Sequence, residues 1–277
     1  MIKVLGIPFD ANSSFLKGTF MAPDRIRLME KEGSANCFSE YGTEIIENKS
    51  HNDLGNLIFT GNDSKNAFNI IKEYIATHIG NNDKMLCLGG DHSITWPIIE
   101  AFSEKFDSLN ILHFDAHTDL YENFENNLYS HASTFARILE VGKIRSLTQV
   151  GIRTLNTHQR NQIKRYGVSV VEMKNFTFDF IKTLKDPLYI SLDLDVLDPA
   201  FAPGVSHHEP GGISTRELIQ IIQSVKNNIV GADIVEYNPV RDVHSTTAMV
   251  AYKIFKELIA KMSEYPVDEL QNNQVAS

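Results

Sequence analysis

Short runs of apolar residues, rich in valine, isoleucine and leucine, recur along the 277-residue chain. Several of these runs show no regular alternation with polar residues, which is typical of strands buried on both faces of a parallel sheet. The pattern predicts strands over residues 2–7, 84–88, 109–114, 148–152, 168–171, 188–192 and 230–235.

Between these runs, apolar residues recur at the spacing of one helical face. The spacing predicts helices over residues 64–79, 132–139, 215–224 and 249–262. Ser214, with Glu217 three residues later, has the pattern of a capping box that starts the third of these helices. Because strands and helices alternate, we expect an α/β protein with three α/β/α layers and a mainly parallel sheet.

No repeat, low-complexity tract or proline-rich linker divides the sequence. We therefore expect a single domain over residues 1–277, with a polar tail at residues 263–277 that frays.

Composition narrows the classes of function. The chain has 26 Lys and Arg against 35 Asp and Glu, for a net charge of −9, which argues against a nucleic-acid-binding protein and is compatible with a cationic small substrate. Cys37 and Cys87 cannot build a disulfide framework, and Cys87 lies in an apolar run as a buried structural thiol. The sequence shows no signal-peptide core and no apolar run approaching the ~20 residues of a membrane helix, so we expect a cytoplasmic protein.

Three short polar segments each follow or end a predicted strand. They are Gly-Gly-Asp-His-Ser at residues 89–93, Asp-Ala-His-Thr-Asp at residues 115–119, and Ser-Leu-Asp-Leu-Asp-Val-Leu-Asp-Pro at residues 191–199. Ligands of open parallel sheets bind outside the carboxyl ends of the strands. We therefore expect all three segments at the same edge of the sheet.

The second segment carries the strongest local pattern. Alternation places Asp115, His117 and Asp119 on one side of an extended segment, where such groups repel or pair unless a cation lies among them. An N-capping aspartate with a solvated histidine is the simpler alternative. His92, in the first segment, is a weak candidate alone, because a histidine beside an aspartate is more often a hydrogen-bonded structural pair.

The third segment adds two carboxylates at the end of an apolar strand. Asp193 and Asp195 share one face and would be costly to bury without a partner, whereas Asp198 before Pro199 is typical of a turn. The three segments together offer four carboxylates and two imidazoles. These are too many ligands for one divalent ion and suit two ions. Carboxylate oxygen with some imidazole favours manganese, and the lack of clustered cysteines excludes a zinc–thiolate site.

Two further residues bear on the substrate. His131 precedes a predicted helix and could transfer protons near the metals, or it could simply cap that helix. Glu236 ends a buried strand and could pair with a planar guanidinium group, or form a salt bridge with Arg241.

The three segments, in this order and spacing, resemble the signatures of the ureohydrolase family, which contains arginase, agmatinase, guanidinobutyrase, proclavaminate amidinohydrolase and formimidoylglutamase. The resemblance runs from residue 89 to about residue 261 and is less clear over the first 88 residues. Residues 129–137, 201–207 and 209–212 are most similar to plant-type arginases, and Glu-Pro-Gly-Gly at residues 209–212 also resembles agmatinases.

The resemblance implies the arginase fold, with a parallel sheet of about eight strands, and hydrolysis of a guanidinium group with release of urea. It also implies two manganese ions per chain and a homotrimer or homohexamer. One ion would be held by His92, Asp115, Asp119 and Asp193, and the other by His117, Asp115, Asp193 and Asp195.

The same resemblance implies that Asp119 orients the attacking water, that His131 shuttles protons and that Glu236 binds the guanidinium. Arginase activity, from L-arginine to L-ornithine and urea, would also need rim groups for the α-amine and carboxylate. Candidates for this rim are Asn127, Ser133 and His207.

Other functions stay open on the sequence alone. The enzyme could be an agmatinase, which converts agmatine to putrescine and urea, or could act on another guanidino compound. A one-zinc deacetylase with a related fold and a catalytically silent binding relative are the alternatives outside the family's chemistry.

Overall fold

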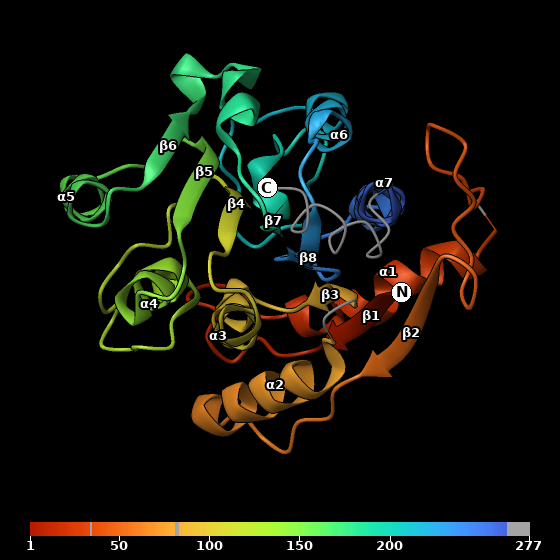
Figure 1. Cartoon of the computed structure of the whole chain (residues 1–277), viewed down its shortest axis with the longest axis horizontal. Coiled ribbons are helices and arrows are strands. Elements are labelled where there is room, and N and C mark those ends of the chain that lie inside the picture. The colour runs from red at the N-terminus through yellow and green to blue at the C-terminus, as the bar shows by residue number, and fades with distance from the viewer. Residues whose placement is uncertain (34, 81–82, 265–277) are drawn as a thin grey trace, which may run out of the picture.

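The computed structural model describes residues 1–33, 35–80 and 83–264. One sheet of eight strands lies between two layers of helices (Figure 1). The strands are β1 (Ile2–Ile7), β2 (His51–Asn56), β3 (Lys84–Gly89), β4 (Asn110–Phe114), β5 (Ser146–Ile152), β6 (Ser169–Glu172), β7 (Leu188–Asp193) and β8 (Ile229–Val235). The helices are α1 (Ala22–Lys31), α2 (Ser64–His78), α3 (Thr95–Lys105), α4 (Thr134–Val141), α5 (Thr157–Tyr166), α6 (Thr215–Ser224) and α7 (Thr246–Ser263).

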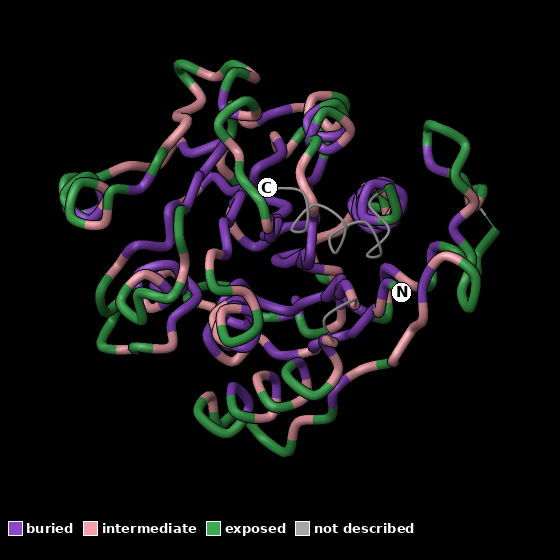
Figure 2. Tube along the Cα trace, viewed as in Figure 1, coloured by how far each residue is buried: buried purple, intermediate pink, exposed green. Residues whose placement is uncertain are grey.

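The strands are ordered β2-β1-β3-β8-β7-β4-β5-β6, and every neighbouring pair is parallel. The four central strands, β3, β8, β7 and β4, are buried along their whole length. Figure 2 shows this buried centre and the exposed outer faces of the helices around it. The central strands therefore confirm the prediction of apolar runs buried on both faces.

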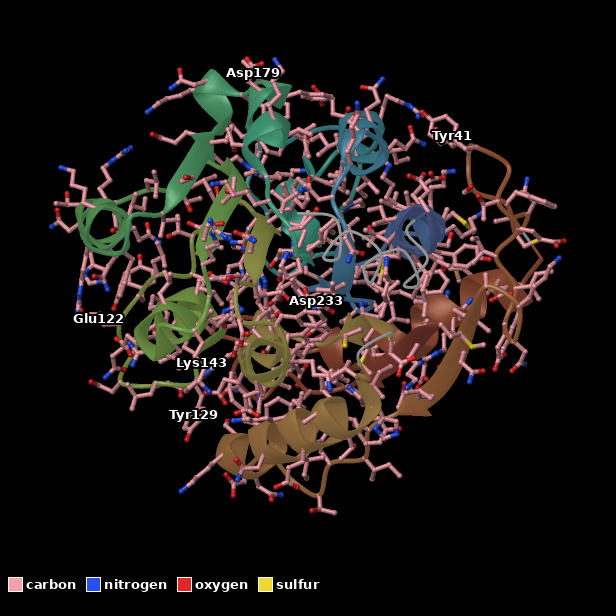
Figure 3. All side chains as sticks on the ribbon, in the orientation of Figure 1. Tyr41, Glu122, Tyr129, Lys143, Asp179 and Asp233 are labelled. Carbon is pink, nitrogen blue, oxygen red and sulfur yellow. The ribbon has the colours of Figure 1, made fainter. Side chains whose placement is uncertain are left out.

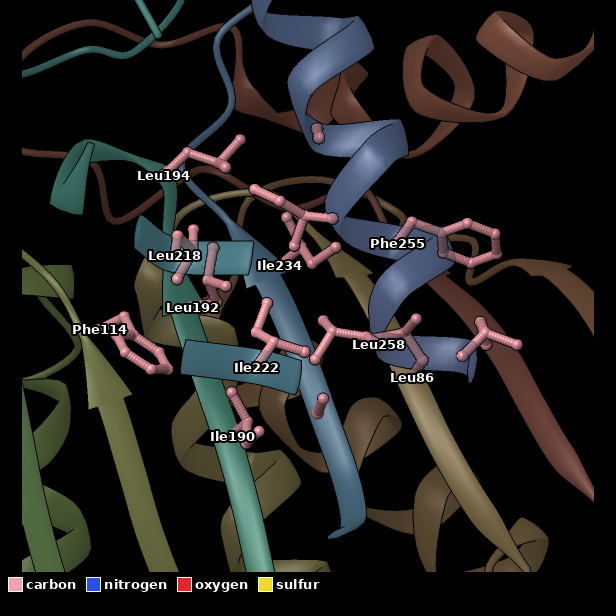
Figure 4. Close-up of a cluster of buried hydrophobic side chains, with 14 of the residues drawn as sticks. Leu86, Phe114, Ile190, Leu192, Leu194, Leu218, Ile222, Ile234, Phe255 and Leu258 are labelled. Carbon is pink, nitrogen blue, oxygen red and sulfur yellow. The ribbon is translucent and has the colours of Figure 1, made fainter. Parts of the chain in front are cut away.

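Each face of the sheet has its own hydrophobic core. On one face, Leu192 and Ile234 of the central strands pack in a cluster with Leu218 of α6 and with Leu258 and Phe255 of α7 (Figure 4). On the other face, side chains of α2, α3 and α4 form the second cluster with the alternate strand residues. These two cores make the sheet a rigid base for whatever its strand ends carry.

The predicted elements match the structure closely where the sequence is apolar. The strands predicted over residues 2–7 and the helix over residues 215–224 have the observed bounds, and the Ser214–Glu217 capping box is present. The last helix begins at Thr246, three residues before its predicted start. The predicted polar tail lies outside the described residues from residue 265 onward.

Four elements of the structure have no counterpart among the predicted strands and helices. β2 is an edge strand of sequence His-Asn-Asp-Leu-Gly-Asn, and α5 is polar on most of its surface. α3 carries Pro97 in its first turn, and α1 carries Pro23 near its start, where proline is tolerated. No helix of the described part of the chain is both long and apolar enough to cross a membrane.

The strand order brings the candidate residues together. β3, β8, β7 and β4 are consecutive in the sheet, and their carboxyl ends lead to His92, Glu236, Asp193 and Asp115. Segments that are far apart in the sequence thus end side by side.

Gly90 allows the carboxyl ends of β1, β3 and β8 to meet. The Asp91 amide donates to the Phe9 carbonyl at 3.0 Å, and the Glu236 amide donates to the Gly90 carbonyl at 2.9 Å. A Cβ atom at Gly90 would lie 2.0 Å from the Phe9 carbonyl oxygen and 2.7 Å from its carbonyl carbon, both of which are backbone atoms. Only glycine fits here without a shift of one strand end.

Replacing Gly90 with alanine should lower the free energy of unfolding by about 2–3 kcal/mol, because backbone must move to relieve the overlap. The matched control is Gly142→Ala at the end of α4, where φ is +67° and an added Cβ meets nothing within 4 Å. That control should lose only about 1–2 kcal/mol, from the left-handed backbone. Urea denaturation of both variants measures the difference, and equal losses would contradict the steric argument.

Candidate metal centre and active site

His92 is held with a bare nitrogen facing a cluster of carboxylates. The residue is fully buried and begins a short 3-10 helix after β3, capped by the Asp91 side chain. Its Nε2 lies 3.0 Å from Ser191 Oγ, and that hydroxyl donates its hydrogen to Asp233 Oδ1 at 2.8 Å. Asp233 lies in the middle of the molecule (Figure 3). Ser191 must therefore accept from His92 Nε2–H, which leaves a lone pair on Nδ1 in the neutral ring.

Three carboxylate oxygens surround this lone pair. Asp115 Oδ2, Asp119 Oδ2 and Asp193 Oδ2 each lie 3.2 Å from His92 Nδ1, and the His92 Nδ1 atom has no hydrogen-bond partner among the described residues. Three anionic acceptors and a nitrogen lone pair that converge in a buried site repel one another unless a cation lies between them. This arrangement fits a divalent metal ion.

A second group of donors adjoins the first. His117 Nδ1 lies 3.0 Å from Asp195 Oδ2 and 3.3 Å from Asp115 Oδ1. Asp115 thus presents one oxygen to His92 and the other to His117, and these three residues with Asp195 span two adjoining positions for metal ions. The backbone amides of Ala116 and Asp195 donate to Asp195 and Asp193, respectively, which fixes both side chains.

The electrostatics of the cluster also require positive charge. Burial and the neighbouring charges of Asp195 and Asp115 raise the pKa of Asp193 well above its ordinary value. Burial and Asp115 likewise raise the pKa of Asp195. Burial opposes ionisation of Asp115 too, but the adjacent side chains of His113, His117 and His92 lower its pKa well below the usual range. The carboxylates can all ionise together only when cations neutralise them.

A cavity of about 230 Å³ opens over these residues. Asp119 and Glu236 both reach it from left-handed backbone, with φ of 50° and 63°, and such strain in non-glycine residues is concentrated at functional sites. The lining comprises Ser14, His117, Asp119, Tyr121, Phe124, His131, Ala132, Thr154, Gln159, Asp193, Asp195, His207, Glu209 and Glu236.

Glu236 has one satisfied oxygen and one without a partner. Its Oε1 accepts from the His92 amide at 2.8 Å and from His131 Nδ1 at 2.7 Å. Its Oε2 is buried and has no hydrogen-bond partner among the described residues. The alternative salt bridge with Arg241 does not form, because Arg241 instead donates to the Ser206 carbonyl and contacts His208.

His131 lies between Glu236 and the N-terminal loop. Burial alone would lower its pKa, but the Glu236 carboxylate raises the pKa of His131 to about 9. The Ser14 amide donates to His131 Nε2 at 3.1 Å, however, and an imidazolium ring has no lone pair to accept it. The neutral ring with its hydrogen on Nδ1 satisfies both contacts, and it is the form that we infer from the geometry.

The predicted rim is only partly present in this cavity. His207 lines it, with its ring 5.5 Å from that of His131 and 5.6 Å from that of Phe15. Asn127 and Ser133, the other two residues predicted for the rim, are not among the residues that line this cavity. The short 3-10 helix begins at His131, so Ser133, two residues later, faces away from His131 and is fully buried. Asn127 accepts from the Tyr129 amide within its own loop.

Five polar lining residues had no signal in the sequence strong enough to identify them: Ser14, Tyr121, Thr154, Gln159 and Glu209. Gln159 lies in the first turn of α5 and the others lie in loops, and only Glu209 belongs to a recognisable motif, Glu-Pro-Gly-Gly. Arg153 holds Glu209 in place by donating to its carbonyl at 2.6 and 2.8 Å, while it also donates to the Asp195 carbonyl.

Comparison with characterised proteins agrees with this geometry. The chain is 46% identical over 276 residues to "Arginase 1, mitochondrial" of Arabidopsis thaliana, which covers 94% of this chain and 81% of that protein. It is 44% identical to "Arginase, mitochondrial" of Medicago truncatula, with 94% and 82% covered. An agmatinase of Bacillus cereus is 31% identical, with 93% and 90% covered.

The prediction of a cytoplasmic protein is wrong in light of these relatives. Plant arginases at 44–46% identity are named mitochondrial or chloroplastic/mitochondrial, so the relatives compared are organellar and not cytoplasmic. The prediction depended on the lack of a signal-peptide core, and such a core distinguishes secreted proteins but not organellar ones from cytoplasmic ones.

Solved structures confirm the predicted arginase fold. The arginase from Medicago truncatula superposes with a TM-score of 0.89 at 43% identity, covering 94% of this chain and 87% of that one. The agmatine ureohydrolase of Thermoplasma volcanium superposes with a TM-score of 0.86 at 28% identity, covering 97% and 92%. The sequence model of the arginase family matches residues 1–260. With its sheet order, its cluster of buried aspartates and histidines and this match over nearly all of its length, the chain belongs to the arginase family.

Proposed function

We propose that this chain is a manganese-dependent arginase, which hydrolyses L-arginine to L-ornithine and urea. The observation that carries the proposal is the unpaired, buried Oε2 of Glu236 beside the converging carboxylates. The identity of 43–46% to plant arginases over most of the chain supports L-arginine as the substrate.

The residues of the cluster would hold two metal ions. His92, Asp115, Asp119 and Asp193 would hold one, and His117, Asp115, Asp193 and Asp195 the other, as the family resemblance implies. Carboxylate oxygens with one imidazole for each ion suit manganese. When bound, the metals would supply a water molecule activated as a nucleophile near neutral pH.

Glu236 is suited to capture the guanidinium group. A carboxylate that is buried and lacks a partner on one oxygen is costly, and a planar cation that donates to Oε2 removes that cost. Among the described residues that line the cavity, none is Lys or Arg, whereas Glu209 adds a further acid near its mouth. The cavity therefore favours a cationic substrate.

His131 is suited to relay to the departing amine the proton that the attacking water loses. Water adds to the guanidinium carbon, the bond from this carbon to the side-chain nitrogen breaks, and the departing amine must gain a proton. The neutral ring of His131 carries hydrogen on Nδ1, 2.7 Å from Glu236, and Ser14 holds the opposite nitrogen. The ring is thereby oriented beside the bound substrate.

The alternative functions fit less well. The agmatinases compared share about 31% identity, against 43–46% for the plant arginases. A silent relative would be expected to lack a metal ligand, and all six candidate ligands converge here. A one-zinc deacetylase would not need this number of carboxylates. A homotrimer or homohexamer remains a prediction from the family resemblance.

Urea release from L-arginine, agmatine and 4-guanidinobutyrate, supplied in parallel to the manganese-loaded protein, tests the substrate. We expect L-arginine to have the highest kcat/KM. Higher values for agmatine would make the protein an agmatinase, and silence on all three with two manganese ions bound would remove the proposed substrate class.

Asp193→Asn should lose metal and nearly all activity while the fold is kept. The variant removes the charge that faces His92, and loss of a metal ligand should lower kcat by about 1000-fold or more. Metal content measured by mass spectrometry checks this. Asp198→Asn, on the same loop but bonded only to backbone amides, is the control and should keep both ions. Two ions and full activity in Asp193→Asn would refute the metal assignment.

Glu236→Gln should keep both metals and lose substrate capture. The amide can still accept from the His92 amide, but its NH₂ would face the donors of the guanidinium, so kcat/KM should fall by about 100-fold. Steady-state kinetics and metal analysis check this together. Glu140→Gln, on the outer face of α4, is the control with unchanged kinetics. Unchanged kinetics in Glu236→Gln itself would assign substrate capture to another group.

A further inference from the structure

Two fully buried polar residues lie behind the metal cluster and have no part in the reaction described above. His113 is on β4 and Gln149 is its register partner on β5, and neither is exposed. His113 Nε2 lies 2.9 Å from Asp115 Oδ2. With His92 and Asp115, its side chain also forms a group close enough to hold a metal ion. His113 could therefore be a ligand or a hydrogen-bond donor.

The contacts of Gln149 decide between these roles. Its Nε2 lies 2.7 Å from the Thr118 carbonyl oxygen and 2.9 Å from His113 Nδ1. A carbonyl oxygen can only accept, so the amide atom beside it must be the NH₂ group. The opposite orientation of the amide would place two oxygens 2.7 Å apart. The second hydrogen of the NH₂ group then points to His113 Nδ1, which must accept it.

This acceptor role fixes the proton of His113. A ring that accepts at Nδ1 is neutral and carries its hydrogen on Nε2. Nε2–H therefore donates to Asp115 Oδ2, and it has no lone pair for a metal ion. The ring is also held in its plane by Phe135, whose centroid lies 3.9 Å away at an interplanar angle of 25°.

We propose that Gln149 and His113 are positioning residues that fix Asp115 Oδ2 for the metal centre, with His113 acting as a hydrogen-bond donor and not as a ligand. The proposal rests on the assignment of Asp115 as a metal ligand in the proposed function. Donation to one oxygen restricts rotation of the carboxylate, which must present Oδ2 toward His92 and Oδ1 toward His117. Partners of this kind typically change metal affinity by 10–100-fold.

The proton position can be read directly by ¹H–¹⁵N correlation of the metal-free, ¹⁵N-histidine-labelled protein. We expect His113 to show the neutral ring with hydrogen on Nε2, and its signals are assigned by their loss in a folded His113 variant. Hydrogen on Nδ1, or on both nitrogens, would overturn the proposal. This measurement needs neither metal nor activity.

Paired substitutions test the effect on metal binding. His113→Gln can place an NH₂ group near the position of Nε2 and should bind Mn²⁺ within about threefold of the wild type. His113→Asn can meet Gln149 but cannot reach Asp115, so its Mn²⁺ affinity should fall by about 10–100-fold. Gln149→Leu should also weaken binding, whereas Gln162→Leu, at a buried glutamine on α5, is the control that should not.

Calorimetric titration of the metal-free variants with Mn²⁺ tests the metal site and the positioning role of His113 separately. Asp193→Asn should lose metal in the same assay, and its retention of both ions would refute the metal site itself. Loss in Asp193→Asn with wild-type affinity in His113→Asn would refute only the positioning role. An equal loss of Mn²⁺ affinity in His113→Asn and His113→Gln would also refute the positioning role, because the donor to Asp115 that His113→Gln retains would then have no effect.

Discussion

Four carboxylates buried at the ends of two neighbouring strands are the constraint on which the rest of the site depends. Asp115 and Asp119 follow β4, Asp193 is the last residue of β7 and Asp195 follows it, and all four are at most 7% exposed. Burying even one ionised carboxylate without a partner costs several kcal/mol. The cluster is stable only with cations, so metal binding and local structure are coupled here. The two hydrophobic cores supply the rigid sheet that keeps the carboxylates together in spite of their repulsion.

In the residues around the carboxylate cluster, hydrogen bonds hold some side-chain atoms in place and leave the functional atoms available. Asp233 and Ser191 fix the proton of His92 and leave its other nitrogen bare, while Gln149 and His113 fix one oxygen of Asp115. Glu236 likewise has one oxygen occupied by His92 and His131 and the other unpaired. In each of these residues, a hydrogen bond from a neighbouring group fixes the side chain and so determines which atom can bind a metal ion or the substrate. Substrate and metals then meet groups that are already oriented.

The sequence predicts the elements of this protein that have a clear apolar periodicity, and the sites where several polar residues follow a strand within a few positions. The central strands and the amphipathic helices follow from periodicity, and the polar segments after β3, β4 and β7 follow from their place at strand ends. The edge strand β2 and the polar helix α5 bury too little to leave such a pattern. The rim was only partly predictable, because Ser14, Gln159 and Glu209 come from two loops and the start of α5, which are far apart in sequence. Ser133 turns away within a single helical turn.

His113 shows why some roles can be seen only in three dimensions. Its spacing of two residues from Asp115 places both side chains on one face of the same extended segment, where either could bind metal. The distinction comes from Gln149, which is opposite His113 in the β4–β5 register. A slip of one residue would turn Gln149 to the other face of the sheet. The hydrogen of the His113 ring would then no longer be restricted to Nε2. The register of β4 and β5 thus determines which nitrogen of His113 carries the hydrogen. That hydrogen in turn orients the Asp115 carboxylate, which faces both histidines of the metal cluster.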